Sequence, residues 1–211
     1  MTNKDGIPVN AVFGFTKMLI KLIDDLKPHY AAVIFDVSRK TFRNDLFEFY
    51  KANRSEPPED LIPQFSLIRE ATEAIGLPVV EMEGFEADDL IATYANIALK
   101  STKKAIVVSS DKDLMQLVDH NTLLFDPMKQ LWIDDVKVYE KFGVYPDQIA
   151  DFLALTGDSV DNIPGVPGVG SKSAIFLLNH FKTLDQVIQR NQEIAYLSFR
   201  GAKSCQKKIA G

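Results

Sequence analysis

The feature of this sequence that most limits its possible folds is the placement of acidic residues directly behind short apolar runs. Residues 31–35 form an apolar run that ends at Asp36, and residues 105–108 form a second that leads through two serines to Asp111 and Asp113. Short continuous apolar runs are typical of strands buried on both faces of a parallel sheet. Ligands of such sheets bind beyond the carboxyl ends of the strands. The two runs therefore predict an α/β sheet with a carboxylate-lined edge.

Helical and strand-like segments alternate along the first 130 residues. Apolar residues at i, i+3 and i+4 predict helices over residues 10–26, 60–75 and 86–99. Two further strands are expected at residues 77–80 and 122–125. This alternation indicates βαβ units, and hence a mostly parallel sheet flanked by helices.

Only helices are expected after residue 134. We therefore predict an α/β core over residues 1–130 and a helical region over residues 131–197. Residues 198–211 form a basic tail with weak periodicity, for which we expect loose order. The expected helices of the helical region are residues 134–142, 146–155, 171–181 and 184–190.

Composition and the distribution of apolar residues exclude several classes of protein. The chain has 211 residues, no apolar run near the ~18 that a membrane span requires, and no secretory signal pattern. Its single cysteine, Cys205, excludes an internal disulfide and a Cys-rich zinc module. The cell interior is therefore the expected compartment, and no membrane association is expected.

Eight carboxylates are predicted to share one region at the sheet edge. Their mutual repulsion requires cations, and Mg²⁺ prefers oxygen ligands of this kind. Two such ions can activate a water and stabilise the leaving oxygen of a phosphodiester. Capping or solvation is the alternative for the acids near residue 88, and Asp113 has the alternative of capping a short helix. The eight are Asp36, Glu86, Asp88, Asp89, Asp111, Asp113, Asp158 and Asp161.

A glycine-rich hairpin joins two of the expected helices. Gly165, Gly168 and Gly170 let the backbone approach a ligand closely, and Ser171 and Lys172 open the next helix. Helix–hairpin–helix elements of this kind grip the DNA backbone without reading bases. A nucleotide P-loop does not fit, because no strand precedes the hairpin and a serine separates the last glycine from the lysine. A plain helix–turn–helix connection remains the alternative.

A basic segment with interleaved aromatic residues follows Asp36. Basic side chains can neutralise phosphates and aromatic rings can stack on unpaired bases. A solvated amphipathic helix would look similar, but the position next to Asp36 favours a segment that faces substrate. The net charge of −5 becomes mildly positive once the eight site acids are set aside, so it does not oppose a nucleic-acid partner. The basic residues are Arg39, Lys40, Arg43, Lys51 and Arg54.

Five stretches of this chain resemble the 5′-nuclease domain of bacterial DNA polymerase I, which belongs to the 5′–3′ exonuclease and flap endonuclease family. The resemblance runs from about residue 5 to residue 184. The stretches are FDVSRKTFRNDLFEFYKANR, EGFEADDLIATYA, VVSSDKDLMQLV, DPMKQLW and LTGDSVDNIPGVPGVGSKSA.

The resemblance implies a PIN-like α/β fold with a helical arch at about residues 39–60 and a helix–hairpin–helix region. It implies hydrolysis of DNA phosphodiesters at 5′ flaps, nicks or gaps with two Mg²⁺ or Mn²⁺ ions, and a K⁺ ion at the glycine hairpin. A DNA polymerase is the implied protein partner. The resemblance also implies a monomer in the bacterial cytoplasm, associated with the nucleoid.

The resemblance also assigns roles to individual residues. Asp36, Glu86 and Asp88 correspond to first-metal ligands, with Asp89 nearby. The remaining four site acids correspond to the second-metal group. Lys51 and Arg54 match positions that contact the scissile phosphate, and Tyr50 matches one that stacks on a base.

Two departures from the family pattern leave alternatives open. Family members begin with an apolar strand that ends in an aspartate, and nothing before Asn10 supplies either feature. The chain also stops soon after the hairpin, so we expect a domain shortened at both ends. A catalytically impaired DNA-binding remnant is therefore the alternative to an active nuclease. An RNA-cutting PIN-type nuclease is a third, although such enzymes generally lack the glycine hairpin.

Overall fold

The chain folds into two compact units, each assembled from two segments. The computed structural model describes residues 1–101 and 103–210, so Gly211 at the end of the predicted tail lies outside the described residues. The first unit contains Met1–Asp45 and Arg54–Ile91, and the second contains Leu46–Asn53 and Ala92–Gly211. The domain organisation expected from the sequence stays a prediction.

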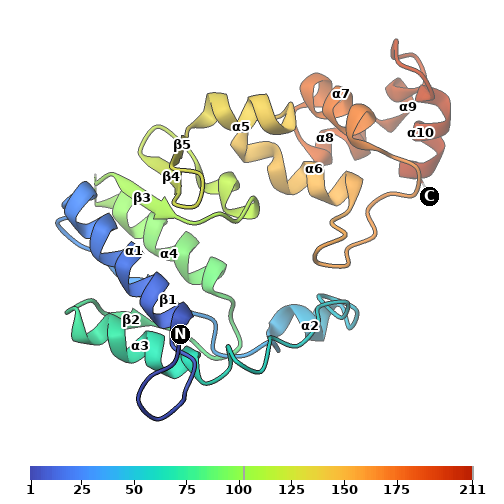
Figure 1. The fold of residues 1–211 in the computed structure, drawn as a ribbon. Helices are drawn as coiled ribbons and strands as arrows, with labels where there is room; N and C mark the ends of the chain where they lie inside the picture. The colour runs from blue at the N-terminus through green and yellow to red at the C-terminus, as the bar shows by residue number, and fades with distance from the viewer. Residues whose placement is uncertain (102, 211) are drawn as a thin grey trace. The chain divides into compact units, whose positions relative to one another are not determined.

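The first unit pairs two helices with a short parallel sheet (Figure 1). Helix α1 (Asn10–Leu26) packs on α3 (Gln64–Ala74). Strand β1 (Val33–Ile34) pairs in parallel with β2 (Val79–Val80). The carboxyl ends of both strands therefore lie at the same edge, as the sequence predicts.

Gln64 connects the two helices of this unit. Its side chain is almost fully buried. Its Oε1 accepts a 2.7 Å hydrogen bond from the backbone N–H of Ala11, and its Nε2 donates to the Asp60 carbonyl at 2.7 Å. The first N–H groups of a helix have no partner within the helix. Gln64 therefore caps α1 from a neighbouring helix, in place of a side chain at the α1 N-cap itself.

The predicted arch is helical over five residues only, in α2 (Phe42–Leu46). Turns follow as far as residue 53, and residues 54–58 have no regular structure. Pro57 and Pro58 explain part of this difference, because proline disfavours the helical conformation of the residue before it and removes a hydrogen-bond donor. The predicted arch region thus contains one short helix, and the rest of residues 39–60 is turn or irregular structure.

A three-stranded sheet forms the start of the second unit. Strand β3 (Ala105–Val108) pairs in parallel with β4 (Thr122–Asp126), and β4 pairs antiparallel with β5 (Leu131–Ile133). Strand β5 was not expected, because three residues are too few to show an alternating pattern. Helix α4 (Ala87–Lys100) precedes this sheet in the chain, and the 3₁₀ helix η1 (Asp113–Leu117) follows β3.

After β5, the regular structure of the second unit is helical. Helix α5 begins at the N-cap Asp134, whose side chain accepts a 2.9 Å bond from the backbone N–H of Lys137. Among the described residues, no helix is long and apolar enough to cross a membrane. The helical elements are α5 (Asp135–Phe142), η2 (Pro146–Gln148), α6 (Ile149–Thr156), α7 (Ser171–Phe181), α8 (Leu184–Gln189), α9 (Asn191–Ile194) and α10 (Ala202–Ala210).

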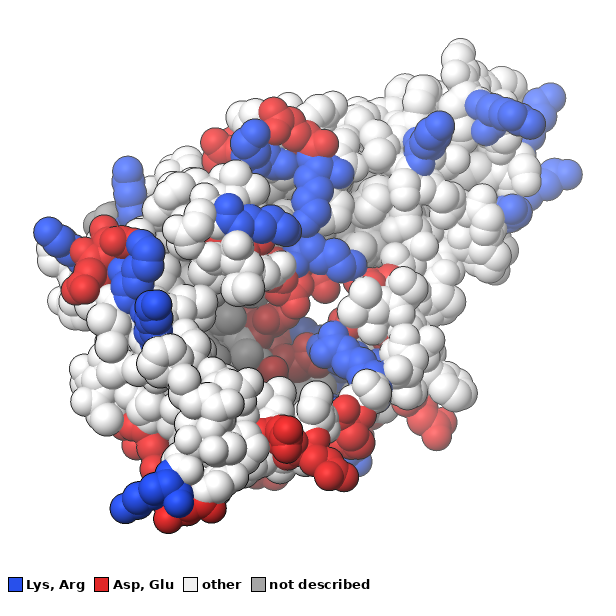
Figure 2. All heavy atoms as spheres, viewed as in Figure 1, with Lys and Arg blue, Asp and Glu red and all other residues white. Residues whose placement is uncertain are grey.

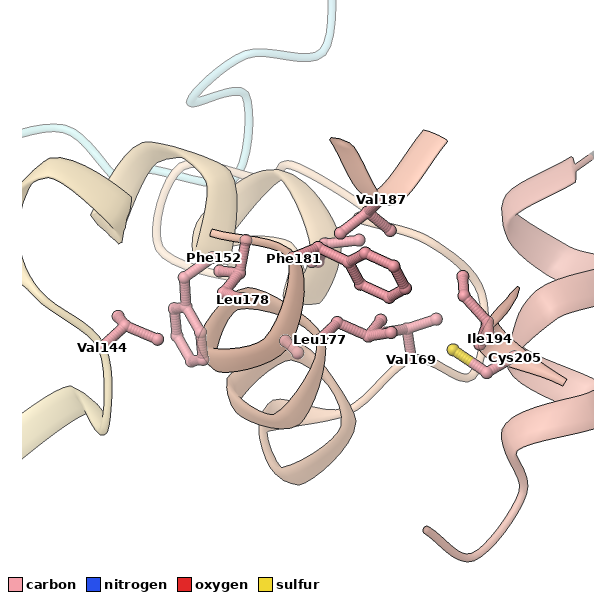
Figure 3. Close-up of a cluster of buried hydrophobic side chains, with 11 residues drawn as sticks. Val144, Phe152, Val169, Leu177, Leu178, Phe181, Val187, Ile194 and Cys205 are labelled. Carbon is pink, nitrogen blue, oxygen red and sulfur yellow. The ribbon is translucent and has the colours of Figure 1, made fainter. Parts of the chain in front are cut away.

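Buried apolar side chains hold these helices together (Figure 3). Leu177 and Leu178 of α7 are fully buried among residues from α6, α8 and α9. Burying such a side chain contributes about 1.5–3 kcal/mol. Cys205 of α10 lies at the edge of this cluster beside Ile194. The expectation of loose order is therefore wrong for residues 202–210, which form a helix that anchors on the core through Ala202 and Cys205.

Candidate active site

The acids of the first unit gather where β1 ends and α4 begins. Asp36 follows β1 by two residues, and its Oδ1 accepts a 2.7 Å hydrogen bond from the backbone N–H of Ala87. Asp89 accepts a 3.0 Å bond from the backbone N–H of Glu86, whose side chain is buried. Asp88 is half-buried in the first turn of α4. The sequence left open that Asp89 caps a helix. Both Asp89 and Asp36 do so, because each accepts a hydrogen bond from a backbone N–H at the start of α4.

Arg43 neutralises Asp89 through a bidentate ion pair. Two of its guanidinium nitrogens donate to the two carboxylate oxygens, each at 2.7 Å. The guanidinium also lies 4.7 Å from the centroid of the Phe42 ring. Both charged side chains are partly buried, which strengthens such a pair. Arg43, expected to contact DNA, is thus engaged by a site acid in this structure.

The acids after β3 form a chain of local hydrogen bonds. The backbone N–H of Asp111 donates to Ser109 Oγ at 3.0 Å, and Asp111 Oδ1 accepts from the backbone N–H of Asp113 at 2.9 Å. The N-cap of η1 is Lys112, so the capping alternative for Asp113 is wrong. Asp113 Oδ1 is buried, and none of the described residues donates a hydrogen bond to it.

Asp126 at the end of β4 belongs to the same sheet edge and was missed by the sequence analysis. It is 2% exposed, accepts a 2.8 Å bond from Ser110 Oγ, and lies 3.2 Å from Lys129 Nζ. Burial alone would raise the pKa of Asp126, but hydrogen bonds from Ser110, Lys129 and Met128 outweigh it and lower the pKa. The sequence contained the signal for Asp126, because the apolar residues 123–125 of the predicted strand lead directly into this aspartate.

Asp158 and Asp161 lie on a closed loop after α6. Backbone hydrogen bonds of 2.8 Å in both directions join Asp158 to Ile163 and close the loop. Both aspartates are buried. Lys112 Nζ donates to Asp158 Oδ2 at 2.5 Å and lies 3.7 Å from Asp113 Oδ1. The ammonium of Lys112 therefore stands between acids from two separate segments.

The pKa shifts show that these groups interact. Burial raises the pKa of Asp113, and the charges of Asp111, Asp158 and Asp161 raise it further against the opposing effect of Lys112. Burial opposes ionisation of Asp158 too, but the hydrogen bond from Lys112 holds its pKa below the usual range. The four acids predicted as the second-metal group are thus brought into one electrostatic neighbourhood within the second unit.

The carboxylate oxygens of these acids are the type of ligand that binds a hard divalent cation. Carboxylate oxygens are the ligands that Mg²⁺ and Mn²⁺ take in proteins, and Asp113 Oδ1 is a buried acceptor without a donor. As the side chains stand, however, no three Asp, Glu, His or Cys residues of the described chain are grouped to hold a metal. Four of the predicted ligands belong to the first unit and four to the second. Their role as metal ligands stays a prediction.

The turn after α2 contacts the loop of Asp161. Tyr50 is 7% exposed and donates from its hydroxyl to Asp161 Oδ2 at 3.1 Å. The expected stacking of Tyr50 on a base requires an exposed ring, which the structure does not show. Lys51 Nζ lies 3.8 Å from the same carboxylate oxygen. The structure thus places Lys51, a predicted catalytic residue, beside a predicted metal ligand.

The remaining basic residues of the segment lie in the first unit. Arg39 donates to Glu56 Oε1 at 2.8 Å and to the Ser55 carbonyl at 2.7 Å. Lys40 is exposed, with its Nζ 3.8 Å from Asp45 Oδ1. Arg54 is exposed in a stretch without regular structure.

Glycine backbones pack closely at the hairpin. Gly165 adopts φ +64°, and a Cβ there would lie 2.2 Å from the backbone nitrogen of Gly157. The backbone N–H of Val166 also donates to the Leu155 carbonyl at 2.9 Å. Only glycine tolerates this approach. The hairpin is therefore fixed against the end of α6.

The hairpin leads into an uncapped helix start. Gly170 is the N-cap of α7, no side-chain cap hydrogen bond is formed there among the described residues, and the first turn contains no acid. Ser171 and Lys172 are exposed there. Ser171 also lines a pocket of about 440 Å³, and Lys112 and Asp158 are among its other lining residues. This arrangement can accept an anion close to the acidic edge.

Basic side chains gather over the C-terminal helices. Figure 2 shows Lys and Arg, and no Asp or Glu, on the visible face of α7–α10. Lys208 of α10 reaches the hairpin, because its Nζ stands 2.0 Å from where a Cβ of Gly168 would be. The exposed lysines and arginines of residues 171–210 are Lys172, Lys182, Arg190, Arg200, Lys203, Lys207 and Lys208.

Two family models together match nearly the whole chain. Residues 1–143 match the N-terminal resolvase-like domain of 5′-3′ exonucleases, and residues 144–210 match their C-terminal SAM fold. The chain belongs to the 5′-3′ exonuclease family. The resemblance inferred from the motifs is confirmed.

Relatives of this 5′-3′ exonuclease family member include short and long proteins. DNA polymerase I of Rhizobium leguminosarum is 53% identical over 203 residues, which are 93% of this chain and 20% of that protein. A 5′-3′ exonuclease of Aquifex aeolicus is 39% identical over 96% of this chain and 70% of its own length. The chain thus spans about a fifth of the polymerase relative and over two thirds of the exonuclease.

Solved structures confirm the PIN-like α/β fold. The T5 D15 protein co-crystallised with metal ions matches with a TM-score of 0.79 at 22% identity, over 96% of this chain and 77% of that one. The catalytic core of Rad2 in complex with a DNA substrate matches with a TM-score of 0.58 at 14% identity, over 99% of this chain and 66% of that one.

Proposed function

We propose that this chain is a metal-dependent, structure-selective 5′ nuclease that hydrolyses phosphodiester bonds of DNA at 5′ ends, flaps or nicks. The proposal draws on the family membership, on relatives named 5′-3′ exonuclease, and on neighbours solved with metal ions or DNA. DNA replication and DNA repair are the processes that would use this cleavage. A DNA polymerase is the proposed partner, since a polymerase relative carries a similar segment.

The observation that carries the proposal is the neighbourhood of Asp111, Asp113, Asp158 and Asp161. Their charges act on one another, and one buried oxygen among them, Asp113 Oδ1, has no donor. Lys51 lies on the edge of this group through its contact with Asp161. An acidic cluster beside a cation is suited to a phosphate that is cleaved with metal assistance.

Each group of residues has a distinct task in this proposal. Bound Mg²⁺ or Mn²⁺ would supply activation of water and stabilisation of the leaving oxygen. The second-unit acids would hold one ion, and Asp36, Glu86 and Asp88 the other. Lys51 and Arg54 would orient and neutralise the phosphate that is cleaved. The hydrogen bond from Lys112 lowers the pKa of Asp158, and the ionised carboxylate is the form that would bind a cation.

The glycine hairpin is proposed to hold the DNA backbone away from the cleavage point. The uncapped first turn of α7 offers backbone N–H groups to a phosphate, and Lys172 adds a positive charge. Such contacts fix position without reading sequence. A K⁺ ion bound by hairpin carbonyls is part of the proposal, and replacement of K⁺ by Li⁺ should then weaken DNA binding.

The decisive experiment incubates the chain with a 5′-flap duplex and Mg²⁺, with the variant Asp111→Asn in parallel. We expect cleavage near the flap junction by the unmodified chain, and turnover lower by about 10²-fold or more for the variant with flap binding preserved. Equal cleavage by the two would contradict the site. Salt-sensitive binding without products would favour a DNA-binding remnant, and preference for single-stranded RNA would favour an RNA nuclease.

A further inference from the structure

The segment that carries Lys51 is tied to the loop of Asp161 by two asparagine side chains. Asn162 Nδ2 donates to the carbonyl of Phe49 at 2.7 Å. Asn53 Nδ2 donates to the carbonyl of Ser159 at 2.8 Å. Each amide thus reaches from its own segment to the backbone of the other. We name this pair of bonds the Asn53–Asn162 clamp.

The contacts of Lys51 and Tyr50 lie between the two bonds of the clamp. The backbone N–H of Lys51 donates to the Asp161 carbonyl at 3.0 Å. Its ammonium lies 3.8 Å from Asp161 Oδ2, which also accepts from the Tyr50 hydroxyl. The clamp therefore brackets Lys51 on both sides, at residues 49 and 53.

The backbone of both segments is in a conformation that requires support. Lys51 has φ +55° and Asn162 has φ +60°, both in the left-handed region. That region is unfavourable for an ordinary residue, although asparagine tolerates it better than lysine. A lysine persists there only where its surroundings fix it. The clamp supplies this constraint, because residues 49–53 form turns without helix or strand.

We propose that Asn53 and Asn162 are positioning residues that fix Lys51 beside Asp161 for the proposed nuclease reaction. The inference rests on that proposed function. Neither asparagine is required to touch DNA. Each acts by fixing the backbone from which the Lys51 ammonium extends, so loss of either amide should leave DNA binding intact and misplace the ammonium.

Two variants break the clamp in different ways. Asn53→Ala removes one amide at a position with an ordinary backbone conformation. Asn162→Asp keeps the shape and the tolerance for positive φ, but a carboxylate cannot donate to the Phe49 carbonyl. The matched control is Asn96→Ala, because Asn96 makes the same kind of bond, 3.0 Å to the Ala92 carbonyl within α4, away from both segments.

Two measurements are made on the full chain. Steady-state cleavage of a 5′-flap duplex should show kcat lower by about 10- to 100-fold for both clamp variants, with KM within twofold. Amide hydrogen exchange should speed up in residues 49–53 and 158–163 of both. Asn96→Ala should change neither. In a Lys51→Ala background, Asn53→Ala should lower kcat no further, because it acts through Lys51.

Three results would overturn the inference: unchanged exchange, unchanged kcat despite faster exchange, or a full additional loss of kcat in the Lys51→Ala background. The last would indicate a general structural effect. If the unmodified chain cleaves nothing, the proposed function fails and the positioning role fails with it. The exchange data then still decide whether the clamp holds the two segments together.

Discussion

Lys112 Nζ lies 2.5 Å from Asp158 Oδ2, although the two residues are 46 positions apart in the chain. The side chain of Asp158 is nearly inaccessible to solvent, whereas the side chain of Lys112 is one-third exposed. The charges of Asp111 and Asp113 also favour the protonated lysine and raise its pKa against the effect of burial. Lys112 therefore occupies a position among carboxylates that suits any cation.

We predict that Lys112→Met makes the second unit more dependent on divalent cations. Without Lys112 the acids repel one another, so in a chelator the free energy of unfolding should fall by about 1–2 kcal/mol. Mg²⁺ should then raise the melting temperature of the variant more than that of the unmodified chain. Thermal unfolding with and without Mg²⁺ measures both effects.

The control for this experiment is Lys137→Met, which removes a lysine whose partner Glu140 lies on the same exposed helix surface. It should leave the response to Mg²⁺ unchanged, because exposed pairs contribute little. Equal stabilisation of Lys112→Met and the unmodified chain by Mg²⁺ would show that Lys112 does not compensate the charges of this group.

Arg43 and Lys40 should differ in their effect on DNA binding. The guanidinium of Arg43 is engaged by Asp89, whereas Lys40 is exposed. Arg43→Ala should therefore lower the free energy of unfolding by about 1–2 kcal/mol and leave the salt dependence of DNA binding unchanged. Lys40→Ala should leave stability unchanged and reduce the salt slope by about 1. Titration of a flap duplex at several salt concentrations measures the effect of each variant on DNA binding, and urea unfolding measures its effect on stability. A lower salt slope for Arg43→Ala, with unchanged stability, would instead assign Arg43 to DNA binding.

Local patterns were sufficient to predict most elements of the fold. The apolar stripe of residues 10–26 and the buried-type runs near residues 33 and 105 became a helix and two strands. These segments are specified by contacts that repeat along the chain. Strand β5 and the helix α10 lacked such a pattern, and α10 is held by the burial of two small side chains, Ala202 and Cys205.

The sequence was sufficient to propose the acids of the candidate site. It did not indicate which basic side chains pair with them. An apolar strand that runs into an aspartate identified Asp36, and the same rule applied to residues 122–125 would have found Asp126. The pairing of Arg43 with Asp89 and of Lys112 with Asp158 joins residues 46 positions apart in both cases. Such contacts depend on the tertiary structure. Some basic residues that the sequence assigned to DNA are therefore paired with site acids.

Ionisation of Asp126 should stabilise the sheet edge near neutral pH. Its folded-state pKa is lowered by the hydrogen bonds it accepts, so its contribution is complete above the unfolded-state pKa of about 3.9 and is lost as the pH falls through the folded value. Asp126→Asn should therefore lower the free energy of unfolding by about 1–2 kcal/mol at pH 7 and by much less at pH 2. Urea unfolding at both pH values tests this, and an equal loss at both would attribute the effect to packing.

Lys208 should contribute to DNA binding through the glycine hairpin. Its ammonium occupies the space that a side chain at Gly168 would fill, so the two positions are coupled. Lys208→Ala should weaken binding of a flap duplex to a similar extent for every sequence and reduce the salt slope by about 1. Gly168→Ala should weaken binding as well, because its Cβ would displace Lys208 and because φ +75° is strained for alanine.

Combining the two variants shows whether Gly168→Ala weakens DNA binding by displacing Lys208. If Gly168→Ala acts by displacing Lys208, the double variant should bind no more weakly than the weaker of the two single variants. Lys137→Ala is the control for loss of one positive charge, because Lys137 is paired with Glu140 on α5. Additive losses in the double variant would show that the hairpin backbone and Lys208 contact DNA independently, and no loss for Lys208→Ala would exclude the lysine from the DNA-binding surface.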